Sequence, residues 1–516
     1  MIALPLPAMA TQAAPDIVHI PALGPPRLPV AAPLLAFALL LYWINPVGYV
    51  GGGGDDWQYL IASECWAAHG PCLPHDHWWA RWPLVAPMAA SISLFGESRA
   101  ALALVPLLYS AAILLLLARI VERIAGRRAA LVAGCALLLT PIFAIQLARP
   151  NIDHPELAFL LVALLGWIEA VRSGERRWAL LLGAGLASAM LARETSAVFV
   201  AGAGIAFLCA PTAHKKVLVW AAPAFVLPLA AEMLAYLAAT GDPFYRLRLA
   251  FGHTRIPSTE LASWVDTRRS AFFNPDFIAG WRAANGIEAH WTVKPIVNLI
   301  THAEIGLTLL AAPLLLTATS RGALDESGGR RLLLALLVIT AGAGLVFTYA
   351  LGLDPKPRMF LPLAAASSAL VGVATVALWR EGRRLLPAAI ALFFIPSALL
   401  CFAGTPGISR AERQAALWLR ETGPLVTTDE TARRHLAMIP AARALPVGDA
   451  SRPLRLAILW EGCTVDGEPG AQVVRRASLQ SGEWAPIAWL RARSIGLHPE
   501  AGPWLCLMRR AAPAPR

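Results

Sequence analysis

The chain has 516 residues, of which 57% are hydrophobic and only 15% are charged, and its formal net charge is +11. A composition this apolar cannot be arranged as one soluble globule of that length, and it predicts a protein that crosses a membrane many times. The positive charge requires no nucleic acid as a partner, because much of it falls in short loops between apolar segments, where membrane proteins collect Lys and Arg.

Apolar segments long enough to cross about 30 Å of hydrocarbon as helices recur along the chain. We expect about eleven membrane spans, at residues 31–50, 100–118, 129–147, 156–171, 178–192, 196–210, 217–239, 305–319, 332–351, 359–379 and 385–402. The predicted fold class is therefore an all-α polytopic membrane protein with a large first outer loop.

Basic residues follow every second predicted span, which indicates how the chain is oriented. They include Arg119, Arg123, Arg127, Arg128, Arg172, Arg176, Arg177, Lys215, Lys216, Arg321, Arg330, Arg331, Arg380, Arg383 and Arg384. Positively charged flanks stay cytoplasmic, so the N-terminus is expected in the cytoplasm. The loops 51–99 and 240–304 and the tail 403–516 are then expected on the outer side. The first span lacks a cleavable signal pattern before it and is expected to be a permanent anchor.

Three parts of the chain differ in character. Residues 1–30 are expected to form a mobile cytoplasmic segment, and residues 31–402 contain all the predicted spans. Residues 403–516 have short apolar runs separated by Gly and Pro, which predicts a small α/β domain on the outer side. None of the five asparagines lies in an Asn-x-Ser/Thr sequon, which favours a bacterial inner membrane with a periplasmic tail over the endoplasmic reticulum.

Four cysteines fall in the predicted outer segments, Cys65 and Cys72 in the first loop and Cys463 and Cys506 in the tail. Disulfides persist on the oxidising side of a membrane, so we expect one disulfide within each segment. The plainer alternative is four unrelated thiols. Metal ligation by Cys65, Cys72 and nearby histidines is a further alternative, but their spacing matches no structural zinc pattern.

Charged residues gather at the predicted outer ends of the spans. In chain order these are Asp55, Asp56, Arg81, Asp153, Arg193, Glu194, Lys356 and Arg358. Most of the carboxylates come early and most of the cations late, an order that suits a reaction on a lipid phosphate. A carboxylate can take a proton from an acceptor hydroxyl while Arg and Lys hold the leaving phosphate. The alternative is that these are ordinary helix-end groups, interacting with helix dipoles or snorkelling.

Several short motifs occur in a recognisable order over roughly residues 31–370. They are an acidic pair with a downstream Tyr59, Arg81-Trp-Pro-Leu, Phe95-Gly96, a lone Asp153, and Pro357-Arg358-Met-Phe-Leu-Pro362. In this order the chain resembles the GT-C integral-membrane glycosyltransferases, and within them the protein O-mannosyltransferases and the aminoarabinose (lipid A) transferases. A stretch from Phe272 to Lys294, which includes His290, fits the resemblance loosely.

The resemblance implies transfer of a sugar from a polyprenyl-phosphate donor, with inversion at the anomeric carbon, to a lipid, glycan or protein acceptor at the outer face. It implies that Asp55 is the first-loop catalytic acid, that Asp56 occupies a position usually filled by Glu, and that Asp153 is the second acid. Phosphate-binding candidates are Arg81, Arg193, Lys356 and Arg358, and acceptor or pocket candidates are Tyr59, His75, His77, Glu194 and His290.

The expected mechanism is a single displacement in which Asp55 is the general base and Asp56 or Asp153 orients it. No cofactor is required, because matched positive charge makes polyprenyl phosphate an adequate leaving group. A divalent metal held by His69, His75, Asp76 and His77 is the alternative to a role of these residues as pocket lining or loop surface.

A second class of function is a membrane transporter or lipid flippase, because intramembrane carboxylates also serve proton relays. A transporter needs ionisable groups near the bilayer midplane and access from both sides. The polar clusters of this chain fall on one predicted side, and no inverted repeat is evident, so the enzyme is favoured.

Overall fold

The computed structural model of the chain describes a helical part and a C-terminal sheet. The described residues are 30–44, 48–49, 55–209, 212–253, 299–300, 304–319, 340–344, 346, 357–402, 408–449, 451–459, 463, 472–478 and 504–509. Of the predicted site residues, His290 and Lys356 lie outside these ranges.

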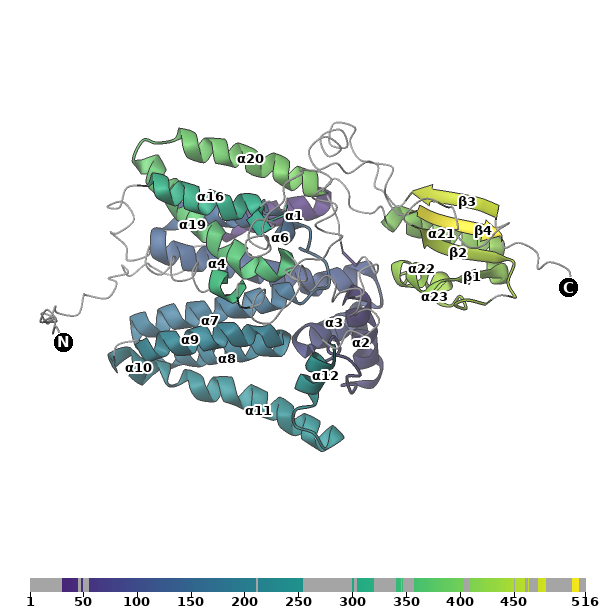
Figure 1. Cartoon of the computed structure of the whole chain (residues 1–516), viewed down its shortest axis with the longest axis horizontal. Coiled ribbons are helices and arrows are strands. Elements are labelled where there is room, and N and C mark those ends of the chain that lie inside the picture. Colours follow the sequence, from purple (N-terminus) through teal and green to yellow (C-terminus); the bar gives the residue numbers. More distant parts are fainter. Residues whose placement is uncertain are drawn as a thin grey trace, which may run out of the picture.

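Helices dominate the described part before residue 403. In chain order they are α1 (Ala31–Ile44), α2 (Asp55–His69), α3 (Trp82–Phe95), α4 (Arg99–Ala125), α5 (Arg127–Leu138), α6 (Pro141–Ala144), α7 (Asp153–Ser173), α8 (Arg176–Ala192), η1 (Glu194–Ser196), α9 (Ala197–Cys209), α10 (Thr212–Leu218), α11 (Ala221–Thr240), α12 (Tyr245–His253), α16 (Gly306–Ala318), η3 (Pro357–Phe360), α19 (Leu361–Arg380) and α20 (Leu385–Phe402). The long helices lie side by side in a bundle, and α2, α3 and α12 lie at one end of it (Figure 1).

Four helical segments of the described part are long and apolar enough to cross a membrane: Arg99–Ala125, Asp153–Ser173, Thr212–Thr240 and Arg358–Arg380. Shorter apolar helices, among them α1, α9, α16 and α20, lie beside them. The prediction of a helical membrane protein is thus confirmed. The number of spans stays a prediction, since most of the segment 332–351 lies outside the described residues.

Neighbouring helices reverse direction at short turns that carry the basic residues. Gly126 at the turn between α4 and α5 has a φ of +85°, and Gly174 between α7 and α8 has a φ of +69°, a region of backbone space that favours glycine. Arg172 ends α7 and Arg176 begins α8 at such a turn. The opposite end of this helix pair therefore carries Asp153 and Arg193.

Two glycines let α7 and α8 approach closely along their length. A Cβ on Gly166 would lie 2.6 Å from the backbone nitrogen of Leu182, and a Cβ on Gly185 would lie 2.7 Å from that of Ala163. Small residues at such contacts are typical of membrane helix pairs, where close backbone packing replaces the hydrophobic effect. This contact fixes the ends of α7 and α8 relative to each other.

The first outer segment was expected to be a loop, and the structure corrects this expectation, because it contains the helices α2 and α3. Asp55 and Asp56 open α2, where their charges favour the helix N-terminus, and Pro83 lies in the first turn of α3. Both helices pack buried faces against each other, with Leu60 and Leu84 fully enclosed. Their apolar runs are too short to be recognised as spans, yet sufficient for a half-buried helix pair.

The C-terminal part forms a four-stranded mixed sheet with helices. It contains α21 (Ile408–Thr422), β1 (Val426–Thr428), α22 (Glu430–His435), α23 (Pro440–Arg443), β2 (Leu454–Leu459), β3 (Gln472–Ser478) and β4 (Trp504–Arg509). The strand order is β1-β2-β4-β3, with β1 and β2 parallel and the other pairs antiparallel. This agrees with the expected α/β character, while the boundary at residue 403 stays a prediction because residues 403–407 are outside the described ranges.

Both expected disulfides are present. Cys65 at the end of α2 is bonded to Cys72, and Cys463 is bonded to Cys506 in β4. The alternative of unrelated thiols is therefore wrong for these four cysteines.

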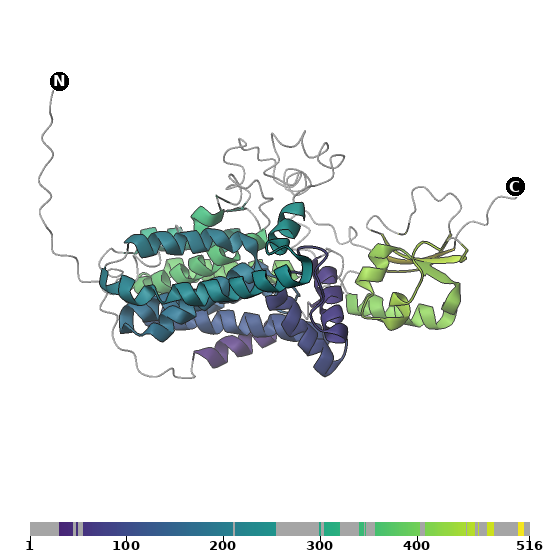
Figure 2. The same ribbon diagram turned by 90° about the horizontal axis from the view of Figure 1, so that it is seen from below.

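The C-terminal unit contacts the end of the bundle that carries α2 and α3 (Figure 2). Arg443 donates a hydrogen bond of 2.6 Å to Glu64 of α2 and pairs also with Glu97. Arg99 at the start of α4 donates to Glu412 of α21 over 2.8 Å. Burial raises the pKa of the Glu64 carboxyl despite the Arg443 guanidinium beside it. These contacts hold the C-terminal unit on the same end of the molecule as the first outer segment.

Candidate active site

Four predicted site residues come from four different segments and meet at one end of the bundle. Asp55 begins α2 and Asp153 begins α7, Arg193 follows the last residue of α8, and Arg358 lies in η3 just before α19. Each lies at a helix end, where backbone groups are only partly satisfied and polar side chains are most easily accommodated.

Ion pairs join these residues into a continuous chain. Arg358 Nη2 lies 2.6 Å from Asp55 Oδ2, and its Nε lies 3.9 Å from Asp153 Oδ2. The other oxygen of Asp153 accepts a hydrogen bond of 2.6 Å from Arg193, which lies 3.2 Å from Glu156 as well. Ser196 donates to Glu156 over 2.6 Å. Carboxylates and guanidinium groups therefore alternate along the site.

The two adjacent aspartates of the first outer segment have different surroundings. Both oxygens of Asp56 accept hydrogen bonds of 3.0 Å from Arg149, and its side chain is only 1% exposed. Asp55 is 19% exposed, pairs with Arg358 and accepts a hydrogen bond of 3.1 Å from the indole of Trp78. A substrate hydroxyl can reach Asp55, whereas Asp56 lies behind it. The geometry favours Asp55 as the reactive carboxylate and Asp56 as a positioning residue.

Replacing Asp56 by Asn is expected to lower the stability of the fold directly and the rate of sugar transfer only indirectly. The change leaves the Arg149 guanidinium without the carboxylate that binds it through two parallel hydrogen bonds. We expect a loss of up to about 3 kcal/mol, the lower end for a broken buried pair, because Arg149 keeps contact with solvent. The measurement is the unfolding midpoint of the purified protein in detergent.

The control for this prediction combines Asp56→Asn with Arg149→Gln, which removes both charges together. We expect the double variant to regain part of the lost stability, because no uncompensated charge remains. An Asp56→Asn protein with an unchanged unfolding midpoint and no transfer activity would contradict the positioning role.

Asn151 explains why α7 begins where it does. Its side-chain oxygen accepts hydrogen bonds from the backbone nitrogens of Asp153, at 2.9 Å, and His154, at 3.1 Å. This satisfies the first donors of the helix in the manner of an N-terminal cap. The first turn of α7 then holds Asp153 and Glu156 on the side of Arg193.

Tyr59 and Arg81 form a second, buried pair beside this chain. Arg81 Nη1 donates a hydrogen bond of 2.5 Å to the Tyr59 hydroxyl, and Tyr59 is fully buried. Burial raises the pKa of Tyr59 strongly, so its hydroxyl stays neutral. The assignment of Tyr59 as an acceptor or pocket residue stays a prediction; the contact that the structure shows for its hydroxyl is with Arg81. Tyr59 holds Arg81, which remains a candidate for phosphate binding.

The other acceptor candidates are divided by the structure. His75 is exposed, with 62% of its side chain accessible. His77 is only 7% exposed and packs against the ring of Trp78 with centroids 3.8 Å apart, and Glu194 accepts a hydrogen bond of 2.9 Å from Arg246. His75 also packs against a ring, that of Trp79, with centroids 4.1 Å apart, but unlike His77 it remains exposed. His77 packs against Trp78, which binds Asp55, and Glu194 binds Arg246, so both contact neighbours of the site.

The histidine-rich turn has no metal geometry in the described ranges. Among those residues, no three His, Cys, Asp or Glu side chains lie close enough to hold a metal ion. Asp76 instead accepts hydrogen bonds from the backbone nitrogens of Trp78 and Trp79, at 2.8 and 3.2 Å, and so shapes the turn. The sequence alternative of a metal held by His69, His75, Asp76 and His77 thus has no support in this geometry.

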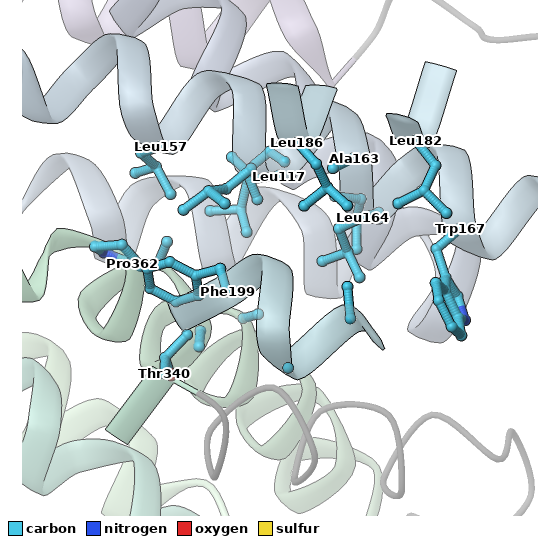
Figure 3. Close-up of a pocket in the computed structure, with 18 of the residues that line it drawn as sticks. Leu117, Leu157, Ala163, Leu164, Trp167, Leu182, Leu186, Phe199, Thr340 and Pro362 are labelled. Carbon is cyan, nitrogen blue, oxygen red and sulfur yellow. The ribbon is translucent and has the colours of Figure 1, made fainter. Parts of the chain in front are cut away.

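An apolar slot of about 340 Å³ lies between helices of the bundle (Figure 3). Its lining includes Leu157, four residues after Asp153 in α7, and Pro362, four residues after Arg358. A separation of four residues is about one helical turn on the same face, so the slot begins about one turn from the ion pairs. Figure 3 shows Leu157 and Pro362 at one end and Trp167 at the other. An anionic group and an apolar tail of one molecule fit this arrangement.

Sequence reasoning missed four residues of this region as site residues: Arg149, Glu156, Glu232 and Arg246. Arg149 and Glu156 lie beside Asp153 in the sequence, and their helix-end position was a usable signal. Glu232 is a lone carboxylate in the apolar helix α11, which is also a signal. Nothing in the sequence marks Arg246 as its partner.

Part of the chain matches a known protein family. Residues 83–236 match the family model described as dolichyl-phosphate-mannose-protein mannosyltransferase. Comparison with curated protein sequences gives no match. The match confirms, for this part of the chain, the resemblance to the protein O-mannosyltransferases predicted from the motifs.

Solved structures with some similarity to this chain include two transferases. ArnT from Cupriavidus metallidurans bound to undecaprenyl phosphate has 14% identity and a TM-score of 0.44, covering 80% of this chain and 74% of that chain. The oligosaccharyltransferase of Archaeoglobus fulgidus with Zn and sulfate has 17% identity and a TM-score of 0.49, covering 81% of this chain and 58% of that chain. This chain thus spans less than two thirds of the archaeal protein.

Proposed function

We propose that this protein is an inverting glycosyltransferase that moves a sugar from a polyprenyl-phosphate donor to an acceptor at the outer face of the membrane. The observation that carries the proposal is the apolar slot that begins one helical turn from Asp153 and Arg358. Such a slot can hold the isoprenoid chain of an amphiphile while the guanidinium groups bind its phosphate. The match of residues 83–236 to a family of lipid-phosphate-dependent mannosyltransferases supports the same reaction class.

The arginines provide the charge that the leaving phosphate needs. Arg358 and Arg193 face the carboxylates of the site, and Arg81 is held by Tyr59. A guanidinium group binds two phosphate oxygens in parallel, which both orients the phosphate and stabilises its growing charge. In this proposal the phosphate competes with Asp55 for Arg358.

The proposed chemistry is a single displacement at the anomeric carbon. The acceptor oxygen attacks this carbon on the face opposite the phosphate, and Asp55 takes the proton of the acceptor hydroxyl. A new bond forms between the acceptor oxygen and carbon as the bond from carbon to the phosphate oxygen breaks, and the electron pair leaves with polyprenyl phosphate. Asp153 orients Arg193 and Arg358 through its contacts with both side chains.

We propose further that the reaction requires no metal, because matched guanidinium charge is enough for a phosphate leaving group. The proposed location is a bacterial inner membrane, with the site and the C-terminal unit on the periplasmic side. The acceptor is a lipid, a glycan or a protein. The transporter alternative is less favoured, since the linked charges gather at one end of the bundle in the described helices.

The test of this function uses purified protein and undecaprenyl phosphate, with undecaprenol as the matched lipid that lacks phosphate. Native mass spectrometry is expected to detect a complex with the phosphate and none of comparable abundance with the alcohol. Membranes that carry labelled lipid-linked sugars are then expected to lose label from the lipid fraction when the protein is present. Equal binding of both lipids, or no loss of label, would overturn the proposal.

A further inference from the structure

A carboxylate inside an apolar helix of the periphery requires a partner. Glu232 lies in α11, none of whose residues is fully buried. Val226, Leu227, Leu234 and Leu237 of the same helix are exposed large apolar side chains, as expected for a surface that faces lipid. Ionisable residues in such helices are costly and are retained where they pair or act. The Glu232 side chain is nevertheless only 13% exposed.

The partners of Glu232 come from two other elements. Its Oε1 atom accepts a hydrogen bond of 2.9 Å from Arg246 of α12 and one of 3.0 Å from the indole nitrogen of Trp82 in α3. Trp82 directly follows Arg81 in the chain. Glu232 therefore fixes the start of α3, where one of the candidate phosphate-binding arginines is located.

Arg246 reaches in the other direction, toward Arg193. Its Nε donates to Glu194 over 2.9 Å, and its Nη2 donates to the backbone carbonyls of Met190 and Leu191, at 3.1 and 2.7 Å. These carbonyls belong to the last turn of α8, and Glu194 directly follows Arg193. The Arg246 side chain is 7% exposed. One guanidinium group thus ties together α11, the end of α8 and the turn that carries Arg193.

The helix that bears Arg246 is itself anchored to the first outer segment. Tyr245 donates a hydrogen bond of 2.7 Å to the backbone carbonyl of Pro74. In Figure 1, α12 lies beside α2 and α3 at the end of the bundle. Arg246 is therefore fixed by the contacts of its own side chain and by the anchoring of its helix through Tyr245.

We propose that the pair Glu232 and Arg246 is a positioning unit that sets the distance between Arg81 and Arg193. Glu232 acts on Arg81 through Trp82, and Arg246 acts on Arg193 through Glu194 and the end of α8. The inference rests on the proposed function, in which both arginines bind the donor phosphate. Groups that hold a reacting phosphate must be fixed to within a fraction of an ångström, and displacement by about 1 Å can lower the rate about 100-fold.

Arg246→Met tests the unit, because Met keeps much of the length of the side chain and removes every hydrogen bond to Glu232, Glu194 and the carbonyls. We expect the dissociation constant for undecaprenyl phosphate and the KM for the lipid-linked donor to rise by about 10- to 100-fold. The KM for the acceptor is expected to change less than the KM for the donor. Arg246→Lys keeps the charge but cannot reach all four acceptors, and it should give an intermediate loss.

Arg248→Met is the matched control. Arg248 lies in the same helix, its side chain is 64% exposed, and its ion pair with Asp242 is local. This variant should bind undecaprenyl phosphate like the unaltered protein. A second comparison is Glu232→Gln, which keeps an oxygen to accept from Trp82 and Arg246 and should be milder than Glu232→Leu.

Unfolding midpoints of all variants separate positioning from stability. Three results would overturn the inference. They are an unchanged affinity of Arg246→Met for undecaprenyl phosphate, an equally weakened affinity in Arg248→Met, and donor and acceptor KM values that rise together. If Arg246→Met does not fold, Arg246→Lys decides it, and unaltered donor KM in that variant counts against the inference. Failure of the unaltered protein to bind undecaprenyl phosphate would instead refute the proposed function itself.

Discussion

Replacing Asp55 by Asn is expected to reduce sugar transfer by about 100- to 10,000-fold, the usual loss when a general base is removed. Asn keeps the shape of the side chain and can still accept the hydrogen bond from Trp78, but it cannot take the proton of the acceptor. The measurement is the rate at which labelled sugar leaves the lipid fraction, with the protein amount held equal. Binding of undecaprenyl phosphate should persist, because Arg358 is retained and loses a competing carboxylate.

The control for Asp55→Asn is Glu175→Gln, which removes a carboxylate at the opposite end of the bundle. Glu175 precedes α8, pairs with Arg177 and is 46% exposed, so transfer should remain as in the unaltered protein. Undiminished transfer by Asp55→Asn at a normal protein level would remove Asp55 as the base.

Replacing Arg358 by Gln is the second change with a large expected effect. Arg358 lies 2.6 Å from Asp55 and 3.9 Å from Asp153, so its guanidinium group lies beside both carboxylates. Loss of a group that stabilises charge on the leaving phosphate is expected to lower kcat by about 100- to 1,000-fold. Arg358→Lys retains a charge without the planar fork, and its kcat should lie between those of the unaltered protein and Arg358→Gln.

Arg380→Gln provides the comparison for Arg358→Gln, because Arg380 ends α19, the helix that follows Arg358, at its far end. Transfer should be unaffected by this change. Steady-state kinetics at saturating donor give the decisive reading: an Arg358→Gln protein whose kcat is retained, with only its donor KM altered, would show that Arg358 binds phosphate without stabilising the transition state.

The sequence was informative about helix ends. Charged residues that border apolar runs lie at the ends of the helices. Asp55, Asp153, Arg193 and Arg358 were therefore predicted on the outer side, and the structure brings them together. The resemblance assigned different roles to Asp55 and Asp56, but the contacts that distinguish them could not be predicted. Adjacent residues of a helix point about 100° apart, and which of them faces Arg149 depends on how α2 packs.

Pairs of residues far apart in the chain were the other feature that the sequence could not predict. Glu232 was recognisable as an isolated carboxylate in an apolar helix, but its partners Trp82 and Arg246 are set by the way α11 and α12 fold back on α3 and α8. The helices of the first outer segment were missed for a related reason. Their apolar faces are complete only when α2 and α3 pack on each other.

The docking of the C-terminal unit restricts the path of the whole chain through the bilayer. Glu64 of α2 and Arg443 of α23 touch, so these two parts of the chain lie on the same side of the membrane. The polypeptide between them must therefore make an even number of crossings, whatever the number of spans. If α1 also crosses, the N-terminus and the C-terminal unit face opposite compartments, a parity rule that follows from one salt bridge rather than from counting apolar segments.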